Sequence, residues 1–228
     1  MSDAAELSSS TGAVTVAFVD LAGFTALTDT HGDHHAADLA GRFADLARGS
    51  LRQGEDVIKT IGDAVMLSAP TPTEGVALVG RICARTDAEA AFPVVRAGLH
   101  HGPVVERDGD LFGATVNLAS RVAAQAAGGQ VLATAAVADA AATAGFDARP
   151  LGAVALRNLP DPVELYELAP CPQPHDRAVD PVCRMAVDRA TAAGRLTHLG
   201  HDHWFCSLAC VAAFATNPDR YPSQESDP

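Results

Sequence analysis

KTIGDAVM, residues 59–66, places a Gly-Asp turn between two short runs of apolar residues. The runs on either side of Gly62 and Asp63 predict a β-hairpin over residues 56–67, around which the other elements are arranged. Lys59 is the only lysine in a chain with 16 basic residues. A lysine ammonium is compact and flexible where an arginine is planar, so a lone lysine four residues before a turn carboxylate indicates chemistry at this hairpin.

The composition describes an acidic chain with enough apolar residues for a packed core. Its 228 residues allow one domain with a small appendage, and 48% of them are hydrophobic. The formal net charge of −12 disfavours nucleic acid and anionic membranes as partners, because the field of the protein repels both. An anionic substrate therefore needs a locally built positive site.

The sequence predicts neither a signal peptide nor a membrane span. Residues 1–12 are acidic and polar, and we expect them to be disordered. No later run approaches the roughly 20 apolar residues that cross a bilayer. We therefore expect a cytoplasmic protein without membrane insertion, in which the five cysteines serve as thiols or metal ligands rather than disulfides.

The first half of the chain predicts alternating strands and helices. Residues 13–20 are β-branched and aromatic, which indicates a buried strand that ends at Asp20. Residues 33–51 have apolar side chains at helical spacing and begin with an aspartate suited to cap a helix. A further helix, capped by Thr73, follows the prolines at positions 70 and 72.

The second half predicts the rest of one domain. Residues 93–106 predict a second hairpin, bent at Gly102-Pro103, and an Asp-Gly turn at 108–109 precedes an Ala-rich helix at 114–126. A strand, a short helix and two more strands then end near residue 168. This order predicts an α+β domain with helices on one side of a mostly antiparallel sheet.

Polar side chains gather at the ends of the predicted elements. Asp20 ends a strand and Asp63 lies in the hairpin turn, so these carboxylates could together hold two divalent cations that clamp a triphosphate. Asn117 and Arg121 stand at i and i+4 on one helix face, where an arginine can bind phosphate and an amide can orient a sugar. Asp110 adds an acceptor nearby. Taken singly, each of these residues is also typical of a turn or a solvated helix.

Three stretches together resemble the signature blocks of class III nucleotidyl cyclase catalytic domains: FVDLAGFT at 18–25, KTIGD at 59–63 and DLFGATVNLASR at 110–121. The resemblance covers residues 13–168. It implies an α+β fold with a ferredoxin-like antiparallel sheet and helices packed on it. It also implies a lyase that makes a cyclic nucleotide and pyrophosphate.

The resemblance gives individual residues a role. Asp20 and Asp63 would bind two Mg²⁺ or Mn²⁺ ions per active site, Asn117 would position the ribose, and Arg121 would stabilise charge at the α-phosphate. Arg157, in the stretch ALRNLP, stands where family members usually carry a phosphate-binding lysine. An arginine in place of a lysine keeps the positive charge and changes how far the side chain reaches.

Lys59 and Asp110 would read the base. Adenine offers an acceptor at N1 and a donor at its C6 amino group, which complement a lysine and an aspartate. Guanine leaves both protein groups facing like partners, so the pair favours ATP over GTP. Family members place the metal aspartates on one subunit and the base, ribose and phosphate groups on the other. Because this chain carries both sets, the resemblance implies a homodimer with two sites.

The C-terminal part differs in composition from the rest. Residues 169–178 predict a linker, residues 179–222 a compact small domain, and residues 223–228 a disordered tail. Three cysteines lie in the small domain: Cys183, Cys206 and Cys210.

These three thiols are candidate ligands of a soft metal, zinc or copper. The last two stand four residues apart, and an i, i+4 spacing puts both on one side of a helix. The stretches DPVCRMAVD and GHDHWFCSLAC resemble the YHS domain, a small module related to metal-binding TRASH-type segments. The fourth ligand stays open among His198, His201 and His203, as does a site with three protein ligands and an open position.

The sequence therefore predicts an adenylate cyclase that converts ATP to 3′,5′-cyclic AMP and pyrophosphate, with a C-terminal metal-binding module as a candidate regulator. A second hypothesis is a metal-responsive sensor or interaction protein whose cyclase-like domain binds nucleotide and turns it over poorly. The first is favoured because all the family positions are filled, whereas a decayed site usually loses a metal aspartate or the arginine.

Overall fold

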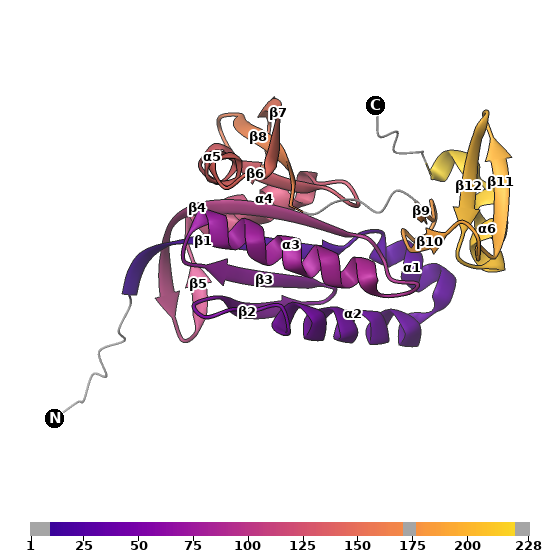
Figure 1. The fold of residues 1–228 in the computed structure, drawn as a ribbon, viewed down its shortest axis with the longest axis horizontal. Helices are drawn as coiled ribbons and strands as arrows, with labels where there is room; N and C mark the ends of the chain where they lie inside the picture. The colour runs from indigo at the N-terminus through magenta and orange to yellow at the C-terminus, as the bar shows by residue number, and fades with distance from the viewer. Residues whose placement is uncertain (1–9, 171–176, 222–228) are drawn as a thin grey trace.

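The structure is a computed structural model that describes residues 10–170 and 177–221 (Figure 1). Residues 1–9 of the predicted disordered segment 1–12, most of the predicted linker and the predicted tail lie outside the described residues, whereas residues 10–12 belong to a strand. In chain order the elements are β1 (Ser10–Leu21), α1 (Phe24–His31), α2 (Asp33–Arg48), β2 (Asp56–Ile61), β3 (Ala64–Ala69), α3 (Pro72–Ala88), β4 (Val95–Arg107), β5 (Asp110–Phe112), α4 (Ala114–Gln125), β6 (Val131–Thr134), α5 (Ala135–Thr143), β7 (Asp147–Val154), β8 (Val163–Ala169), β9 (Arg177–Val179), β10 (Ala186–Asp188), β11 (Gly194–His198), β12 (His201–Phe205), α6 (Leu208–Thr216) and the short 3₁₀ helix η1 (Pro218–Arg220).

One eight-stranded sheet forms the body of the molecule. Its order is β2-β3-β1-β4-β6-β8-β7, with β5 paired to β4. Only β4 and β6 run parallel among the pairs of this described sheet. The long central pair joins β1 to β4 along twelve residues, from Ser10 opposite Glu106 to Leu21 opposite Val95. The predicted α+β class with a mostly antiparallel sheet is confirmed.

Helices cover both faces of this sheet, which differs from the one-sided arrangement predicted. Along β1, Ala17 and Val19 belong to the large core formed with α1, α2, α3 and α5. Val16 points the other way and packs with Met66 and with Ala119 of α4. Because side chains alternate along a strand, an apolar run such as VTVAFV supplies both faces, so the sequence alone does not tell one helical layer from two.

The predicted second hairpin is also wrong, because β4 is a single strand. Pro103 lies within it, opposite Ala13 of β1. On its other side β4 pairs with β6 at Ala97–Leu99 and with β5 at Val105–Arg107, so Pro103 falls between these two partners. There the Thr115 hydroxyl donates to the Pro103 carbonyl at 2.7 Å. A proline is tolerated in a strand where its missing N–H has no ladder partner.

Two element ends also differ from the prediction. Strand β1 begins at Ser10, three residues before the predicted start. The cap of α3 is Thr71 and not Thr73, because the Thr71 side chain accepts a hydrogen bond from the Glu74 amide and Pro72 takes the first helical position. Proline is favoured there because that position needs no amide donor.

The C-terminal part, residues 177–221, packs against the sheet domain beside α1 (Figure 1). It contains the hairpins β9–β10 and β11–β12, followed by α6. Backbone hydrogen bonds join the two parts, from the Val94 amide to the Arg184 carbonyl at 3.0 Å and from the Ala186 amide to the Phe92 carbonyl at 2.9 Å. Their buried side chains share one core, so the small domain is fixed to the large one. Among the described helices, none is long and apolar enough to cross a membrane.

Candidate active site and candidate metal centre

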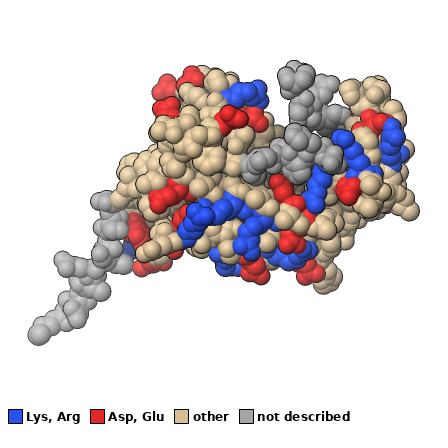
Figure 2. Space-filling view, in the orientation of Figure 1, with Lys and Arg blue, Asp and Glu red and all other residues tan. Residues whose placement is uncertain are grey.

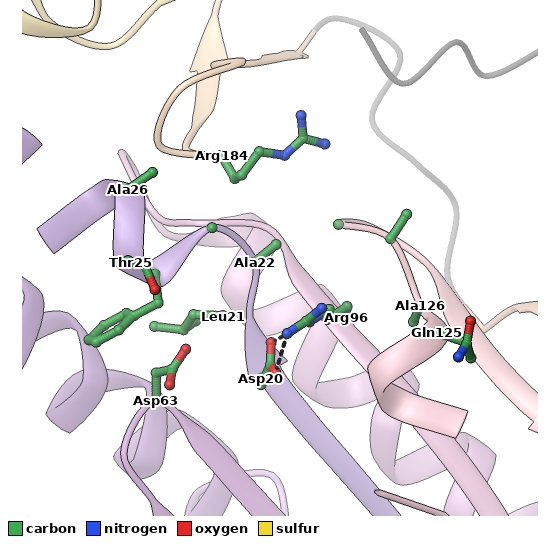
Figure 3. Close-up of a pocket in the computed structure, with 14 residues that line it drawn as sticks. Asp20, Leu21, Ala22, Thr25, Ala26, Asp63, Arg96, Gln125, Ala126 and Arg184 are labelled. Atoms are coloured by element: carbon green, nitrogen blue, oxygen red, sulfur yellow. Dashed lines mark hydrogen bonds and ion pairs between the residues drawn. The ribbon is translucent and has the colours of Figure 1, made fainter. Parts of the chain in front are cut away.

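A pocket of about 720 Å³ opens where the end of β1 meets the β2–β3 turn (Figure 3). Asp20 lies in its wall, and so does Asp63 from the turn. The Leu21 amide donates to the Asp63 carbonyl at 3.3 Å, which holds the turn against β1. The two-residue turn forms because Ile61 pairs with Ala64 and Gly62 adopts φ 62°, a left-handed conformation that suits glycine.

Arg96 of β4 is bound to one of these carboxylates. Its Nε and Nη2 atoms donate to the two Asp20 oxygens at 2.8 and 2.9 Å, and this bond raises the pKa of Arg96. Burial, together with the Asp20 charge, raises the pKa of Asp63. Two carboxylates this close favour a cation between them, because each makes ionisation of the other costlier. Their oxygen donors suit Mg²⁺ or Mn²⁺.

The pocket is lined by charged side chains of both signs. Acidic and basic side chains are interspersed over the face seen in Figure 2, and the chain as a whole carries a formal charge of −12. Two arginines line the pocket, Arg96 from β4 and Arg184 from the C-terminal part. These two arginines place guanidinium groups, which can bind an anion, beside Asp20 and Asp63.

Lys59 and Asp110 meet on β2 and β5. The Lys59 ammonium donates to both Asp110 oxygens, at 2.8 and 2.6 Å, and these bonds lower the pKa of Asp110. A register shift in β2 between Val57 and Lys59 changes the pairing with β3 at this point. Lys59 also lies 6.0 Å from the ring centroid of Phe112, whose side chain is half exposed. The pair is partly exposed, so a ligand can reach it.

The other predicted residues lie elsewhere on the chain. Asn117 is exposed on α4, Arg121 is partly exposed one turn later, and Arg157 is exposed in the loop after β7. None of these three, nor Lys59 or Asp110, lines the pocket that holds Asp20 and Asp63. Within one chain, Asp20 and Asp63 therefore lie at the pocket, and the other five predicted residues lie outside it.

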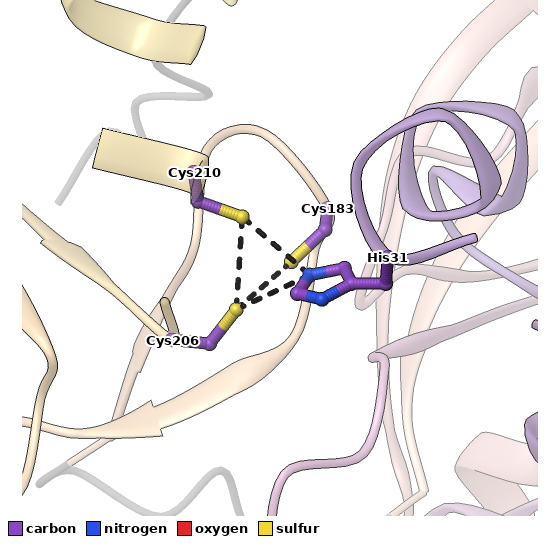
Figure 4. Close-up of side chains that lie close together, drawn as sticks. All are labelled: His31, Cys183, Cys206 and Cys210. Carbon is purple, nitrogen blue, oxygen red and sulfur yellow. Dashed lines mark hydrogen bonds between the residues drawn. The ribbon is translucent and has the colours of Figure 1, made fainter. Parts of the chain in front are cut away.

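A cluster of soft ligands lies in the C-terminal part (Figure 4). The Cys183 and Cys206 sulfurs are 3.3 Å apart, and the Cys206 and Cys210 sulfurs are 3.7 Å apart. The hydrogen bond to Cys206 raises the pKa of Cys183, and the hydrogen bond from Cys183 lowers the pKa of Cys210. The three predicted cysteines therefore come together as free thiols and not as a disulfide.

A histidine of the sheet domain also lies beside these sulfurs. His31, at the end of α1, places Nε2 at 3.6 Å from the sulfurs of both Cys206 and Cys210. The predicted candidates for a fourth ligand are elsewhere: the rings of His198 and His203 pack on Phe214, and His201 lies outside the cluster of four. None of the three predicted histidines belongs to the cluster of four, which instead contains His31.

Asp180 binds the backbone of the segments that carry Cys183 and Cys206. Its side chain is fully buried, with one oxygen accepting from the Val182 amide and the other from the Cys206 amide, each at 2.8 Å. Burial raises the pKa of this carboxyl. A carboxylate that binds amides on both loops fixes the two loops relative to each other.

Sequence reasoning missed Arg96, Arg184 and His31. Arg96 lies directly opposite Asp20 in the pairing of β1 with β4. A prediction of that strand pairing would have identified Arg96. His31 was not found because it lies 175 positions before Cys206. Arg184 directly follows Cys183, and its position next to a proposed ligand was the available signal.

Known proteins resemble the sheet domain in fold and in sequence. A model of the adenylate and guanylate cyclase catalytic domain matches residues 7–170. A pH-sensitive adenylate cyclase from Mycobacterium tuberculosis is 41% identical over 159 residues, which make up 68% of this chain and 40% of that protein. This chain thus spans less than half the length of that relative.

Solved structures agree with the fold. An adenylate cyclase from Trypanosoma brucei, studied in its monomeric state, has a TM-score of 0.63 and 26% identity, covering 71% of this chain and 89% of that one. The adenylyl cyclase CyaB from P. aeruginosa has a TM-score of 0.60 over 75% of this chain and 99% of that one, and at 21% identity it supports the fold alone. The chain belongs to the adenylate and guanylate cyclase catalytic domain family.

Proposed function

We propose that the protein is an adenylate cyclase that converts ATP to 3′,5′-cyclic AMP and pyrophosphate. The observation that carries the proposal is the convergence of Asp20 and Asp63 on one pocket, beside Arg96. In the proposed reaction the ribose 3′-oxygen forms a bond to the α-phosphorus. The bond from that phosphorus to the oxygen bridging the α- and β-phosphates breaks, and the 3′-hydroxyl proton is lost.

The residues of the chain have distinct parts in this reaction. Asp20 and Asp63 would hold two Mg²⁺ or Mn²⁺ ions, which would lower the pKa of the 3′-hydroxyl and neutralise the triphosphate. Arg96 lies beside the carboxylates and places its guanidinium where a phosphate oxygen can take over one of its hydrogen bonds. Asn117 orients the ribose, and Arg121 and Arg157 stabilise the charge that develops on the phosphates.

The preference for adenine rests on Lys59 and Asp110. In the free chain each satisfies the other, at 2.6–2.8 Å. An incoming adenine can accept from the lysine at N1 and donate its amino hydrogen to the carboxylate, so neither group loses a partner on binding. Guanine would instead face the lysine with a donor and the carboxylate with an acceptor, so neither bond could form with the base.

The complete site needs a second copy of the chain. Because Lys59 and Asp110 lie outside the pocket of Asp20 and Asp63, one copy supplies the metal carboxylates and the other supplies the base-reading pair. Exposed apolar side chains at Ile61, Val105 and Phe112 support this arrangement, since a partner would cover them.

We also propose that residues 179–222 form a YHS-like module that binds a soft metal ion through Cys183, Cys206 and Cys210. The alternative function, a metal-responsive sensor with a weakly active nucleotide-binding domain, shares this module. The two differ in turnover, so a turnover measurement separates them.

The test is production of cyclic AMP by the purified full chain with ATP and Mn²⁺ or Mg²⁺. We expect Asp63→Ala to lower kcat by at least about a hundredfold, because the divalent ions lose a ligand. Asp161→Ala, an exposed aspartate in the loop before β8, is the matched control and should keep wild-type activity. Cyclic AMP no higher in the wild type than in Asp63→Ala would leave the sensor hypothesis standing instead.

A further inference from the structure

The four ligand atoms of the thiol cluster come from two parts of the chain. Cys183 precedes β10, Cys206 follows β12, and Cys210 lies in the first turn of α6. His31 closes α1 of the sheet domain (Figure 4). All four ligand atoms lie within 4.8 Å of one another.

Three of the spacings between ligand atoms fit a tetrahedral ion, whereas the Cys183 and Cys206 sulfurs, at 3.3 Å, lie closer together than two thiolates on one zinc ion. Zinc binds thiolate at about 2.3 Å and imidazole at about 2.0–2.1 Å, so neighbouring ligands of a tetrahedral site stand about 3.8 Å apart for two sulfurs and about 3.6 Å for sulfur and nitrogen. Here the Cys206–Cys210 distance is 3.7 Å, and both distances from His31 to a sulfur are 3.6 Å. Three cysteines and one histidine are a usual ligand set for structural zinc.

Helix α1 connects this cluster to the nucleotide pocket. The helix has eight residues, so it is about 12 Å long. At its beginning Gly23, Phe24 and Thr25 line the pocket, and at its end stands His31. An ion bound to His31 therefore fixes the far end of the element that forms one pocket wall.

Arg184 makes a second connection. It follows Cys183 directly and adopts φ 61°, while its carbonyl accepts from Val94 of the sheet domain. Its side chain crosses Gly23 so closely that a Cβ on that glycine would lie 2.4 Å from the Arg184 Cγ atom. A Cβ on Gly128, which also lines the pocket, would lie 3.3 Å from the Arg184 Nε and Nη2 atoms. Figure 3 shows Arg184 at this pocket. Side-chain-free positions at Gly23 and Gly128 thus make room for this arginine.

We propose that Cys183, Cys206, Cys210 and His31 bind one zinc ion that joins the C-terminal module to the catalytic domain, and that the bound ion holds Arg184 in place to bind the phosphates of the nucleotide. The second half of this inference rests on the proposed function, because it assigns a nucleotide to the pocket. The first half concerns metal binding alone and stands apart from turnover.

The metal site is tested by titrating the reduced, metal-free full chain with Zn²⁺ and Co²⁺. We expect one ion per chain, and a Co²⁺ absorption spectrum typical of tetrahedral thiolate and imidazole ligands. His31→Ala should weaken zinc binding at least about tenfold and change the Co²⁺ spectrum. His31→Cys should restore affinity through a fourth thiolate, with its own spectrum. His34→Ala, an exposed histidine of the next helix, should match the wild type.

An unchanged Co²⁺ spectrum and zinc affinity in His31→Ala would exclude His31 as a ligand while leaving a three-cysteine site intact. A disulfide between Cys183 and Cys206 in the freshly isolated protein, detected by mass spectrometry, would contradict a zinc site altogether. Recovery by His31→Cys separates loss of a ligand from loss of folding.

The coupling is tested by nucleotide affinity with and without zinc. Using Mg²⁺ and α,β-methylene-ATP, which cannot be cyclised, we expect Arg184→Ala to weaken binding about tenfold, the cost of one hydrogen bond to a charged group. Removing zinc with a zinc-selective chelator should weaken binding similarly in the wild type and have no further effect in Arg184→Ala. Arg189→Ala, another arginine of the same module, is the control.

Zinc dependence that persists in Arg184→Ala, or wild-type affinity that zinc removal leaves unchanged, would overturn the coupling. Because the analogue reports binding and not turnover, these outcomes can be told apart from failure of the proposed function. An inactive wild type that still shows zinc-dependent binding through Arg184 would refute the cyclase proposal and leave this inference standing.

Discussion

Lys59 and Asp110 form the residue pair that we propose sets substrate choice. Their two hydrogen bonds, at 2.6 and 2.8 Å, hold the flexible lysine beside the carboxylate before a nucleotide arrives. Both side chains are about one third exposed, so each bond is weakened by water and can be exchanged. A base that replaces both bonds is favoured over one that replaces neither.

We predict that the double variant Lys59→Ala, Asp110→Ala loses this discrimination. The ratio of kcat/KM for ATP to that for GTP should fall about tenfold or more, since hydrogen bonds to charged groups contribute about 1.5–3 kcal/mol each. The measurement is the rate of each cyclic nucleotide under equal conditions. Glu106→Ala, an exposed strand carboxylate near this pair, serves as the control. An ATP to GTP ratio equal to that of the wild type would assign base choice to other residues.

For single residues, the sequence predicted well the polar groups set by local features. It predicted poorly the contacts between residues far apart in the chain. Asp20 and Asp63 were found because a strand end and a hairpin turn are local features, and they line one pocket. Lys59 was found because it is the only lysine. His31 was missed because only the packing of α1 against the C-terminal module brings it to Cys206, and no pattern within either segment encodes that packing.

The elements β4 and α4 approach each other closely at Gly98. A Cβ on Gly98 would lie 2.0 Å from the Ala123 backbone nitrogen, inside the α4 helix. Backbone atoms cannot rotate away, so any side chain there must push α4 off the sheet. Helix α4 carries Asn117 and Arg121, so this close approach sets the position of two residues of the proposed site.

We predict that Gly98→Ala destabilises the protein by about 1–3 kcal/mol or more through overpacking. The unfolding temperature should fall, and kcat should fall with it, because α4 shifts. Gly12→Ala, on the neighbouring strand β1, has nothing within 4 Å of the new Cβ and should stay within about 0.5 kcal/mol of the wild type. Equal stability of the two variants, by denaturant unfolding, would contradict this account of the β4–α4 contact.

Residues 93–106 were wrongly predicted as a hairpin, for a physical reason. Gly and Pro together usually mark a turn. Here Gly102 stays within a strand and a Cβ there would meet the Thr115 hydroxyl oxygen at 2.7 Å, so the glycine serves close packing against α4. Pro103 falls where β4 has no ladder partner on one side. The positions of both residues are explained by contacts with segments distant in sequence. A local sequence pattern contains no information about such contacts.

For the whole molecule, the chain divides its polar groups between two places. Asp20 and Asp63 lie at one pocket, and Lys59 and Asp110 lie outside it. The hairpin β2–β3 contributes to both, because it carries Lys59 on one strand and Asp63 in its turn. The C-terminal module is packed into the same core as the catalytic domain, so it is placed to act on the pocket through α1 and Arg184.

The central claim is an adenylate cyclase site shared between two copies of the chain, and mixing two inactive variants tests it most directly. Asp63→Ala lacks a metal ligand and Arg121→Ala lacks the phosphate arginine, so each should be nearly inactive alone. After subunit exchange at equal amounts, half of the dimers are mixed and each holds one complete site, which predicts about a quarter of wild-type cyclic AMP production. No recovery on mixing, with both variants folded and exchanging subunits, would contradict a shared site.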